Sequence, residues 1–189
     1  MGKIEAICGP MFSGKSEELI RRMNRYNYAK KAFLLLKPKI DSRYSADEVV
    51  SHNKTKLPAC VIETADDLAE ICQRNPGIKL IGIEEVQFIK DTETNSVIQV
   101  ISQLKREGKH ILVAGLDMDS SGQPFSFMPA LLAIADEVYK LKAVCFSCGE
   151  DASMSHRKVE NKETVLVGTS AEYTALCFNC WAKLNNAVK

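Results

Sequence analysis

Blocks of apolar and polar positions alternate along most of the chain. Short continuous apolar runs are typical of strands that are buried on both faces, and apolar residues three or four positions apart are typical of helices. The pattern predicts strands over residues 3–8, 32–36, 79–84, 110–116 and 138–144, and helices over residues 16–31, 64–74, 92–107 and 130–136. Because strands and helices alternate, we expect an α/β fold with a mainly parallel sheet flanked by helices.

Three stretches interrupt this pattern. Residues 9–14 and 119–129 are rich in turn-forming residues, and residues 41–57 are polar without periodicity, which predicts a long mobile loop. After residue 143 the texture changes, because cysteines cluster and regular periodicity is lost until the C-terminal end. We therefore predict a larger domain over residues 1–142 and a smaller one over residues 143–189.

Composition and charge exclude several classes of protein. Of the 189 residues, 46% are hydrophobic, which is enough for a sizeable core. The net charge is +1, with 25 basic and 24 acidic residues, so a broad nucleic-acid-binding surface is not expected. The N-terminus lacks the apolar core of a signal peptide, and we find no apolar stretch long enough to span a membrane. An odd number of cysteines, seven, then favours a reducing cytoplasmic setting over a disulfide framework.

Residues 9–16 match the phosphate-binding pattern G-x-x-x-x-G-K-[ST], with an apolar strand before it and a helix after it, as the motif requires. Glycines let the main chain wrap around phosphate, and backbone N–H groups then face the anion. The Lys15 ammonium is expected to neutralise phosphate oxygens, and the Ser16 hydroxyl to bind Mg²⁺. A chance glycine turn is the alternative, and the strand–loop–helix context argues against it. The predicted ATP site comprises Gly9, Pro10, Met11, Phe12, Ser13, Gly14, Lys15 and Ser16.

Two carboxylates, Glu84 and Glu85, follow the apolar strand predicted over residues 79–84. In enzymes with this phosphate loop, an acid at the end of a neighbouring strand holds the Mg²⁺ shell. We predict that Glu84 takes this role through a bound water and that Glu85 is the general base, which must reach the proton of an attacking hydroxyl. The alternative is that both acids merely end a strand in solvent. We expect the ATP site to extend over Glu84, Glu85, Val86 and Gln87.

Two Cys-x-x-Cys pairs lie near the C-terminal end: Cys145 with Cys148, and Cys177 with Cys180. Two such pairs can place four thiolates tetrahedrally around Zn²⁺. Four sulfur ligands close the coordination sphere, so a structural rather than a catalytic zinc is predicted. Redox-active thiols or inert cysteines are the alternatives.

These three features, in this order, resemble the type II thymidine kinase family, and the similarity runs from about residue 3 to residue 181. Further segments agree with that family's pattern. They are Lys37-Pro38 followed by Asp41-Ser42-Arg43-Tyr44, Glu85-x-Gln87-Phe88, Gly115-Leu116-Asp117, Pro124-Phe125, Val167-Gly168, and Glu172-Tyr173 ahead of Cys177.

The resemblance implies transfer of the γ-phosphoryl group of ATP to the 5′-hydroxyl of thymidine or deoxyuridine. It also implies a homotetramer, inhibition by thymidine triphosphate, and a segment between the cysteine pairs that folds over the nucleoside. By position it assigns the substrate-binding residues, although Met11, Phe88 and Phe125 on their own would be interpreted as core residues. These residues are Met11, Arg43, Phe88, Phe125, Ser155, Val165, Gly168 and Tyr173.

The chain departs from the family's pattern at a few positions. Glu84 stands where the family has Asp, Ser120 and Ser121 where it has an aromatic and a basic residue, Ser155 where it has Thr, and Thr169 where it has Gly. These departures leave the phosphate chemistry intact and bear on the preferred base. Two rival functions follow from the motifs: an ATPase whose zinc module binds a partner, and a nucleotide sensor that has lost kinase activity.

Overall fold

A computed structural model describes residues 1–39, 48–50, 56–159 and 170–186 of the chain. Within these residues, six strands form one sheet in the order β5-β2-β6-β7-β1-β8, and every neighbouring pair runs parallel. The predicted parallel sheet is therefore confirmed. Its strands are β1 (Lys3–Cys8), β2 (Phe33–Pro38), β5 (Cys60–Ile62), β6 (Leu80–Ile83), β7 (His110–Gly115) and β8 (Glu137–Lys140).

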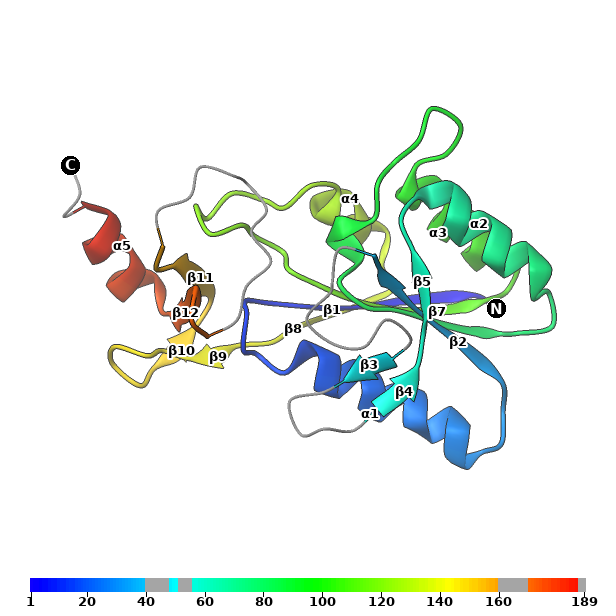
Figure 1. Ribbon diagram of the computed structural model, residues 1–189, viewed down its shortest axis with the longest axis horizontal. Helices are drawn as coiled ribbons and strands as arrows, with labels where there is room; N and C mark the ends of the chain where they lie inside the picture. Colours follow the sequence, from blue (N-terminus) through cyan, green and yellow to red (C-terminus); the bar gives the residue numbers. More distant parts are fainter. Residues whose placement is uncertain (40–47, 51–55, 160–169, 187–189) are drawn as a thin grey trace.

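Helices cover both faces of this sheet, with α1 on one side and α2, α3 and α4 on the other (Figure 1). Along β1, Ile4 and Ala6 pack toward α2–α4, whereas Ile7 packs toward α1. Successive side chains of a strand point to opposite faces, so a strand between two helical layers is apolar over most of its length, and Glu5 is the buried charged exception within β1. The helices are α1 (Lys15–Tyr28), α2 (Ala65–Arg74), α3 (Val97–Arg106) and α4 (Met128–Ile134).

Two of the helices begin with a capping box. Thr64 caps α2 together with Asp67, and Ser96 caps α3 together with Gln99. The helix predicted from residue 92 therefore starts later, because Thr92 accepts a hydrogen bond from the Asn95 N–H at 2.9 Å and closes a turn before the cap. No helix in the described part of the chain is both long and apolar enough to cross a membrane.

The prediction of a long loop over residues 41–57 is wrong for the part of this range that the structure describes. Short strands β3 (Glu48–Val50) and β4 (Lys56–Pro58) pair antiparallel there. Val49 and Leu57 are buried and pack into the core cluster on the α1 side. This packing explains why the two strands form although polar residues flank them. The rest of the predicted loop lies outside the described residues. Strand β5, only three residues long, carries too short an apolar run to be predicted.

The strand predicted over residues 138–144 is divided in two. Strand β8 ends at Lys140, and the Leu141 N–H donates to the Cys8 carbonyl at 2.8 Å before the chain leaves the sheet. The following β9 (Ala143–Val144) instead pairs antiparallel with β10 (Asp151–Ala152). These strands, β11 (Met154–Arg157), β12 (Tyr173–Leu176) and α5 (Phe178–Asn186) make up the C-terminal part (Figure 1).

The C-terminal part has a small apolar cluster of its own, separate from the two clusters that flank the large sheet. The boundary near residue 143 remains a prediction. The buried members of the small cluster are Ala143, Cys145, Ala152, Ala175 and Leu176.

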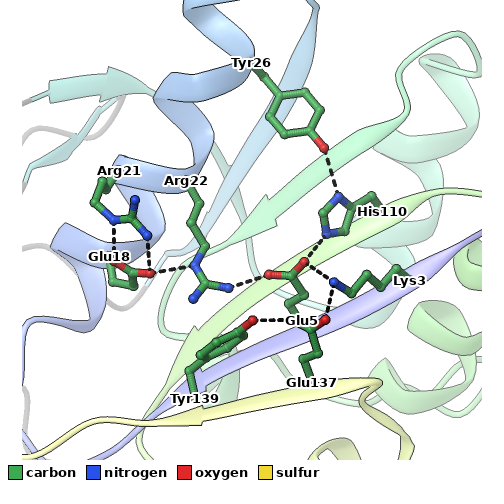
Figure 2. A network of polar contacts seen from close by, with 9 residues as sticks. All are labelled: Lys3, Glu5, Glu18, Arg21, Arg22, Tyr26, His110, Glu137 and Tyr139. Atoms are coloured by element: carbon green, nitrogen blue, oxygen red, sulfur yellow. Dashed lines mark hydrogen bonds and ion pairs between the residues drawn. The ribbon is translucent and has the colours of Figure 1, made fainter.

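A network of charged side chains attaches α1 to the sheet (Figure 2). Arg22 contacts Glu18 on its own helix and Glu5 on β1, and its guanidinium carbon lies 3.8 Å from the ring centre of Tyr139 on β8. His110 on β7 approaches Glu5 with its Nε2 at 3.0 Å. Burial alone would raise the pKa of Glu5, but hydrogen bonds and charges from its cationic neighbours lower it overall. The helix that begins at the phosphate-binding pattern is thus held against three adjacent strands.

Candidate active site

The turn over residues 9–14, called the phosphate loop below, connects β1 to α1 at the carboxyl edge of the sheet. Gly9 has φ 136°, and a Cβ there would lie 2.4 Å from the Leu141 carbonyl oxygen. Gly14 has φ 82° and precedes α1, and among the described residues no side chain caps this helix start. The first backbone N–H groups of α1 therefore face the loop and form an environment suited to an anion.

Lys15 places its positive charge inside the phosphate loop. The side chain is buried, and its Nζ donates to the Pro10 carbonyl oxygen at 2.8 Å. Ser13 Oγ donates to the same oxygen at 2.8 Å. An ammonium group held here can pass to the oxygens of a bound phosphate without a large movement of the main chain.

The first turn of α1 also meets the end of β6. The Ser16 hydroxyl donates a hydrogen bond to Oε1 of Glu84, and Glu84 is only 4% exposed. A hydroxyl and a carboxylate side by side are oxygen ligands of the kind that Mg²⁺ prefers. The two residues predicted to hold Mg²⁺ thus lie together, and their oxygen atoms fit the metal chemically.

Glu85 follows in a left-handed backbone conformation, with φ 46°, just before the short helix η1 (Val86–Phe88). Its Oε2 accepts a hydrogen bond from Gln87 Nε2 at 2.7 Å, and Gln87 Oε1 in turn accepts from the Leu116 N–H at 3.1 Å. Such a conformation is uncommon for residues other than glycine and tends to occur at functional sites. Gln87 therefore orients the carboxylate of Glu85, a contact that the sequence pattern did not reveal.

Glu84 and Glu85 differ in their surroundings. Glu84 is buried, whereas Glu85 is partly exposed. A group that accepts a proton from a second substrate has to be accessible to it. This difference favours Glu85 over Glu84 for contact with an acceptor.

Two aromatic side chains expected at the nucleoside site contact each other. The rings of Phe88 and Phe125 lie 5.6 Å apart between centres, almost perpendicular at 87°. The Phe125 N–H donates to the Asp117 carbonyl at 3.0 Å, which fixes this ring beyond the end of β7. Both rings are half-buried, and Phe125 also packs against the core on the α2–α4 side. The two rings can therefore contact a nucleoside base on their exposed side while Phe125 packs against the core.

The four cysteines of the two Cys-x-x-Cys pairs converge in space. Their Sγ atoms all lie within 4.8 Å of one another, and those of Cys148 and Cys177 are 3.7 Å apart. Sulfur ligands around a tetrahedral Zn²⁺ with bonds near 2.3 Å would be about 3.8 Å apart. The cluster formed by Cys145, Cys148, Cys177 and Cys180, called the cysteine cluster below, therefore fits a structural zinc ion.

The pKa shifts of the thiols in the cysteine cluster also favour a bound metal ion. Backbone N–H groups, first that of Cys177, lower the pKa of the Cys145 thiol to about 6. The Glu150 N–H favours the thiolate of Cys148, but the neighbouring cysteines outweigh it and raise the pKa of Cys148 to about 12. Four thiolates this close repel one another, and a divalent cation relieves that repulsion.

The structure describes only part of the expected nucleoside site in the C-terminal part. The Ser155 hydroxyl accepts a hydrogen bond from the Met11 N–H at 2.9 Å, so two of the expected substrate-binding residues lie together. Tyr173 is buried, and its hydroxyl accepts from Arg157 Nε at 3.2 Å. Arg43, Val165, Gly168 and Thr169 lie outside the described residues.

Trp181 on α5 is a contact residue that the sequence analysis missed. Its Nε1 donates to the Ser120 carbonyl at 3.3 Å, and a Cβ at Gly122 would lie 3.3 Å from the indole ring. The helix that carries Cys180 thus contacts the segment after β7 that contains Ser120 and Gly122. The only signal in the sequence was that this is the single tryptophan of the chain.

Comparison with known proteins gives consistent results. The sequence model described as thymidine kinase matches residues 2–181. A thymidine kinase from Bacteroides thetaiotaomicron is 47% identical over 182 residues, which cover 96% of this chain and 88% of that protein. One from Porphyromonas gingivalis is 42% identical over 185 residues, covering 98% of this chain and 87% of that protein.

Proposed function

The chain belongs to the thymidine kinase family, and we propose that it transfers the γ-phosphoryl group of ATP to the 5′-hydroxyl of thymidine or deoxyuridine. The observation that carries the proposal is the contact between Ser16, at the start of the helix that follows the phosphate loop, and Glu84 at the end of β6. It joins an anion-binding helix start to an acidic strand end, which is the arrangement that phosphoryl transfer from a nucleoside triphosphate needs.

In this proposal the triphosphate of ATP lies along residues 9–16. Backbone N–H groups and Lys15 offset its charge, and this charge is greatest in the transition state. Ser16 and Glu84 would hold Mg²⁺, which supplies further charge neutralisation between the phosphate oxygens. Arg43 is proposed to face the phosphates as well.

Glu85 acts as the general base. As the acceptor oxygen forms its bond to the γ-phosphorus, the hydroxyl proton passes to the Glu85 carboxylate, and the bond to the bridging oxygen of ADP breaks. The hydrogen bond from Gln87 holds the carboxylate in one orientation. Most of the rate gain is expected from positioning and electrostatics, because phosphoryl transfer requires little covalent chemistry from the protein.

The nucleoside is proposed to lie between Phe88, Phe125 and Met11, with Ser155 and Tyr173 on its other side. Val165 and Gly168 complete the set that the family resemblance implies. Val86 belongs to the proposed ATP site. The zinc ion in the cysteine cluster has no part in the chemistry and stabilises the segment that bears these residues.

A homotetramer and feedback inhibition by thymidine triphosphate are proposals that rest on the family resemblance. The proposed cytoplasmic location rests on the odd number of cysteines, and the proposed lack of nucleic-acid and membrane partners rests on the net charge of +1 and on the lack of a long apolar stretch. Light scattering coupled to size-exclusion chromatography would measure the oligomer, and inhibition assays with thymidine triphosphate would measure feedback.

A nucleoside panel tests the proposed function. Purified protein is incubated with ATP, Mg²⁺ and each of thymidine, deoxyuridine, deoxycytidine, deoxyadenosine and deoxyguanosine, and both ADP and nucleoside monophosphate are quantified. We expect thymidine and deoxyuridine monophosphates in amounts equal to ADP. Hydrolysis of ATP at the same rate without a nucleoside would indicate the rival ATPase, and the absence of any monophosphate would refute the proposal.

A further inference from the structure

The hydrogen bond between Met11 and Ser155 joins two distant parts of the chain. Met11 lies in the middle of the phosphate loop, whereas Ser155 lies on β11 in the C-terminal part. The hydroxyl is 2.9 Å from the Met11 nitrogen, and Ser155 is only 5% exposed. A hydrogen bond shielded from water in this way contributes more than one at the surface.

The same peptide group is also held at its other end. The Pro10 carbonyl oxygen accepts hydrogen bonds from Lys15 Nζ and Ser13 Oγ, both at 2.8 Å. The Pro10 carbonyl and the Met11 N–H belong to one planar peptide unit, so fixing one end sets the direction of the other. Ser155 therefore helps to orient the carbonyl that Lys15 contacts.

Ser155 is itself rigidly placed. In the ladder between β11 and β12 it lies opposite Ala175, and β12 ends directly before Cys177 of the cysteine cluster. The neighbouring Met154 is buried, and its methyl group would lie 3.0 Å from a Cβ at Gly122. The hydroxyl thus reaches the phosphate loop from a strand that is fixed on both sides.

We propose that Ser155 is a positioning residue for the phosphate donor, whose hydroxyl holds the Met11 amide and the phosphate loop in the conformation that binds ATP. This inference rests on the proposed function, since it takes ATP as the ligand of the loop. It goes beyond the contact with the base that the resemblance implies, because it predicts an effect on the triphosphate rather than on the nucleoside.

The test compares Ser155→Val with Ser155→Thr in the zinc-loaded protein. Both variants have a branched side chain of similar shape, but only threonine keeps the hydroxyl. The Kd for ATP is measured by isothermal titration calorimetry without nucleoside. We expect Ser155→Val to weaken ATP binding by about 3- to 10-fold, the usual effect of losing one hydrogen bond, and Ser155→Thr to stay within about twofold of wild type.

Kinetics provide a second measurement that a merely structural role would not reproduce. In Ser155→Val the KM for ATP should rise while kcat at saturating ATP stays close to wild type. Ser153→Val, two residues earlier in the same part of the chain, is the matched control and should bind ATP as the wild type does. Zinc content and melting temperature verify that each variant is folded, and Ser155→Ala replaces the valine variant if that one unfolds.

Equal ATP affinity in the valine and threonine variants would overturn the inference, as would a change confined to the KM for thymidine. The proposed function can be refuted independently of the inference on Ser155. Wild-type protein that binds ATP but phosphorylates no nucleoside would refute the kinase assignment and leave the role of Ser155 measurable. Wild-type protein that does not bind ATP would refute both.

Discussion

The Ser16 hydroxyl donates a hydrogen bond to Glu84, although the two residues are 68 positions apart in the chain. Ser16 stands in the first turn of α1, and Glu84 directly follows β6, so the contact spans the carboxyl edge of the sheet. In open α/β sheets this edge is where ligands bind. Glu84 accepts this hydrogen bond directly, so the two residues that we propose to hold Mg²⁺ contact each other.

Replacing the proposed base should slow the reaction without removing the nucleotide. In Glu85→Gln the side chain keeps its shape but cannot take the proton, and we expect turnover to fall by about 10²–10⁴-fold. The Kd for ATP should change little, because the phosphate loop is untouched. Steady-state kinetics and calorimetry measure the two effects. Glu93→Gln, at an exposed position outside the site, is the control, and turnover near wild type in Glu85→Gln would exclude the assigned role.

A methyl group at Gly9 should disrupt the phosphate loop. Its Cβ would lie 2.4 Å from the Leu141 carbonyl oxygen, and φ 136° is strained for alanine. We expect Gly9→Ala to lower the free energy of unfolding by about 1–3 kcal/mol and to abolish measurable ATP binding. Gly77→Ala is the matched control, because among the described residues no atom beyond the adjoining ones in the chain lies within 4 Å of a Cβ there. Denaturant titration and calorimetry measure both quantities, and unchanged ATP affinity would contradict the proposed site.

Removing one sulfur ligand should empty the zinc site. The wild-type protein should contain about one Zn²⁺ per chain by elemental analysis, and Cys148→Ser should contain almost none. Its melting temperature should fall, since a structural zinc contributes directly to folding. Cys60→Ser is the control, because Cys60 is exposed and lies outside the cysteine cluster. The assignment would be disproved if the wild-type protein contained no metal and melted at the same temperature as Cys148→Ser.

The free energy of unfolding should depend on pH through the ionisation of Glu18. Hydrogen bonds from Arg21, and then from Arg22 against the cost of burial, lower the pKa of Glu18 from 4.5 to about 2 (Figure 2). Because the folded-state pKa is depressed, this stabilisation is complete above pH 4.5 and is lost as the pH falls toward 2. We expect Glu18→Gln to lower the free energy of unfolding by about 1–2 kcal/mol at neutral pH, after allowance for solvent screening.

The difference between wild type and Glu18→Gln should therefore vanish near pH 2. Urea titrations at several pH values measure it, with Glu93→Gln as the control. A difference that stays constant between pH 4.5 and pH 2 would show that the ion pairs of Glu18 are not its cause.

The sequence predicted the elements whose signal is local. Buried strands such as β6 and β7 are apolar at nearly every position, so their runs are visible without a structure. The prediction failed where the signal was short or polar, as in β5 and in the pair β3–β4, because their pairing partners supply the stability. It also placed the start of α3 too early, because the turn at Thr92 looks like a helix start until the cap at Ser96 is seen.

In the candidate site, too, some features could be predicted from local sequence and others could not. The phosphate loop and the cysteine pairs have fixed spacings over a few residues, and their residue types alone indicate the chemistry. The hydrogen bonds from Gln87 to Glu85 and from Met11 to Ser155 carry no such spacing. Neither do the edge-to-face contact of Phe88 with Phe125 and the contact of Trp181 with Ser120.

The sequence by itself therefore determined the α/β architecture and was enough to predict the anion-binding loop and the four sulfur ligands, because each depends on residues close together in the chain. Only the tertiary structure decided which carboxylate is buried beside Ser16 and which remains accessible, and that the C-terminal part contacts the phosphate loop through Ser155. The physical reason is that hydrogen-bond partners far apart in the chain are selected by the packing of strands and helices, and local residue patterns do not encode that packing.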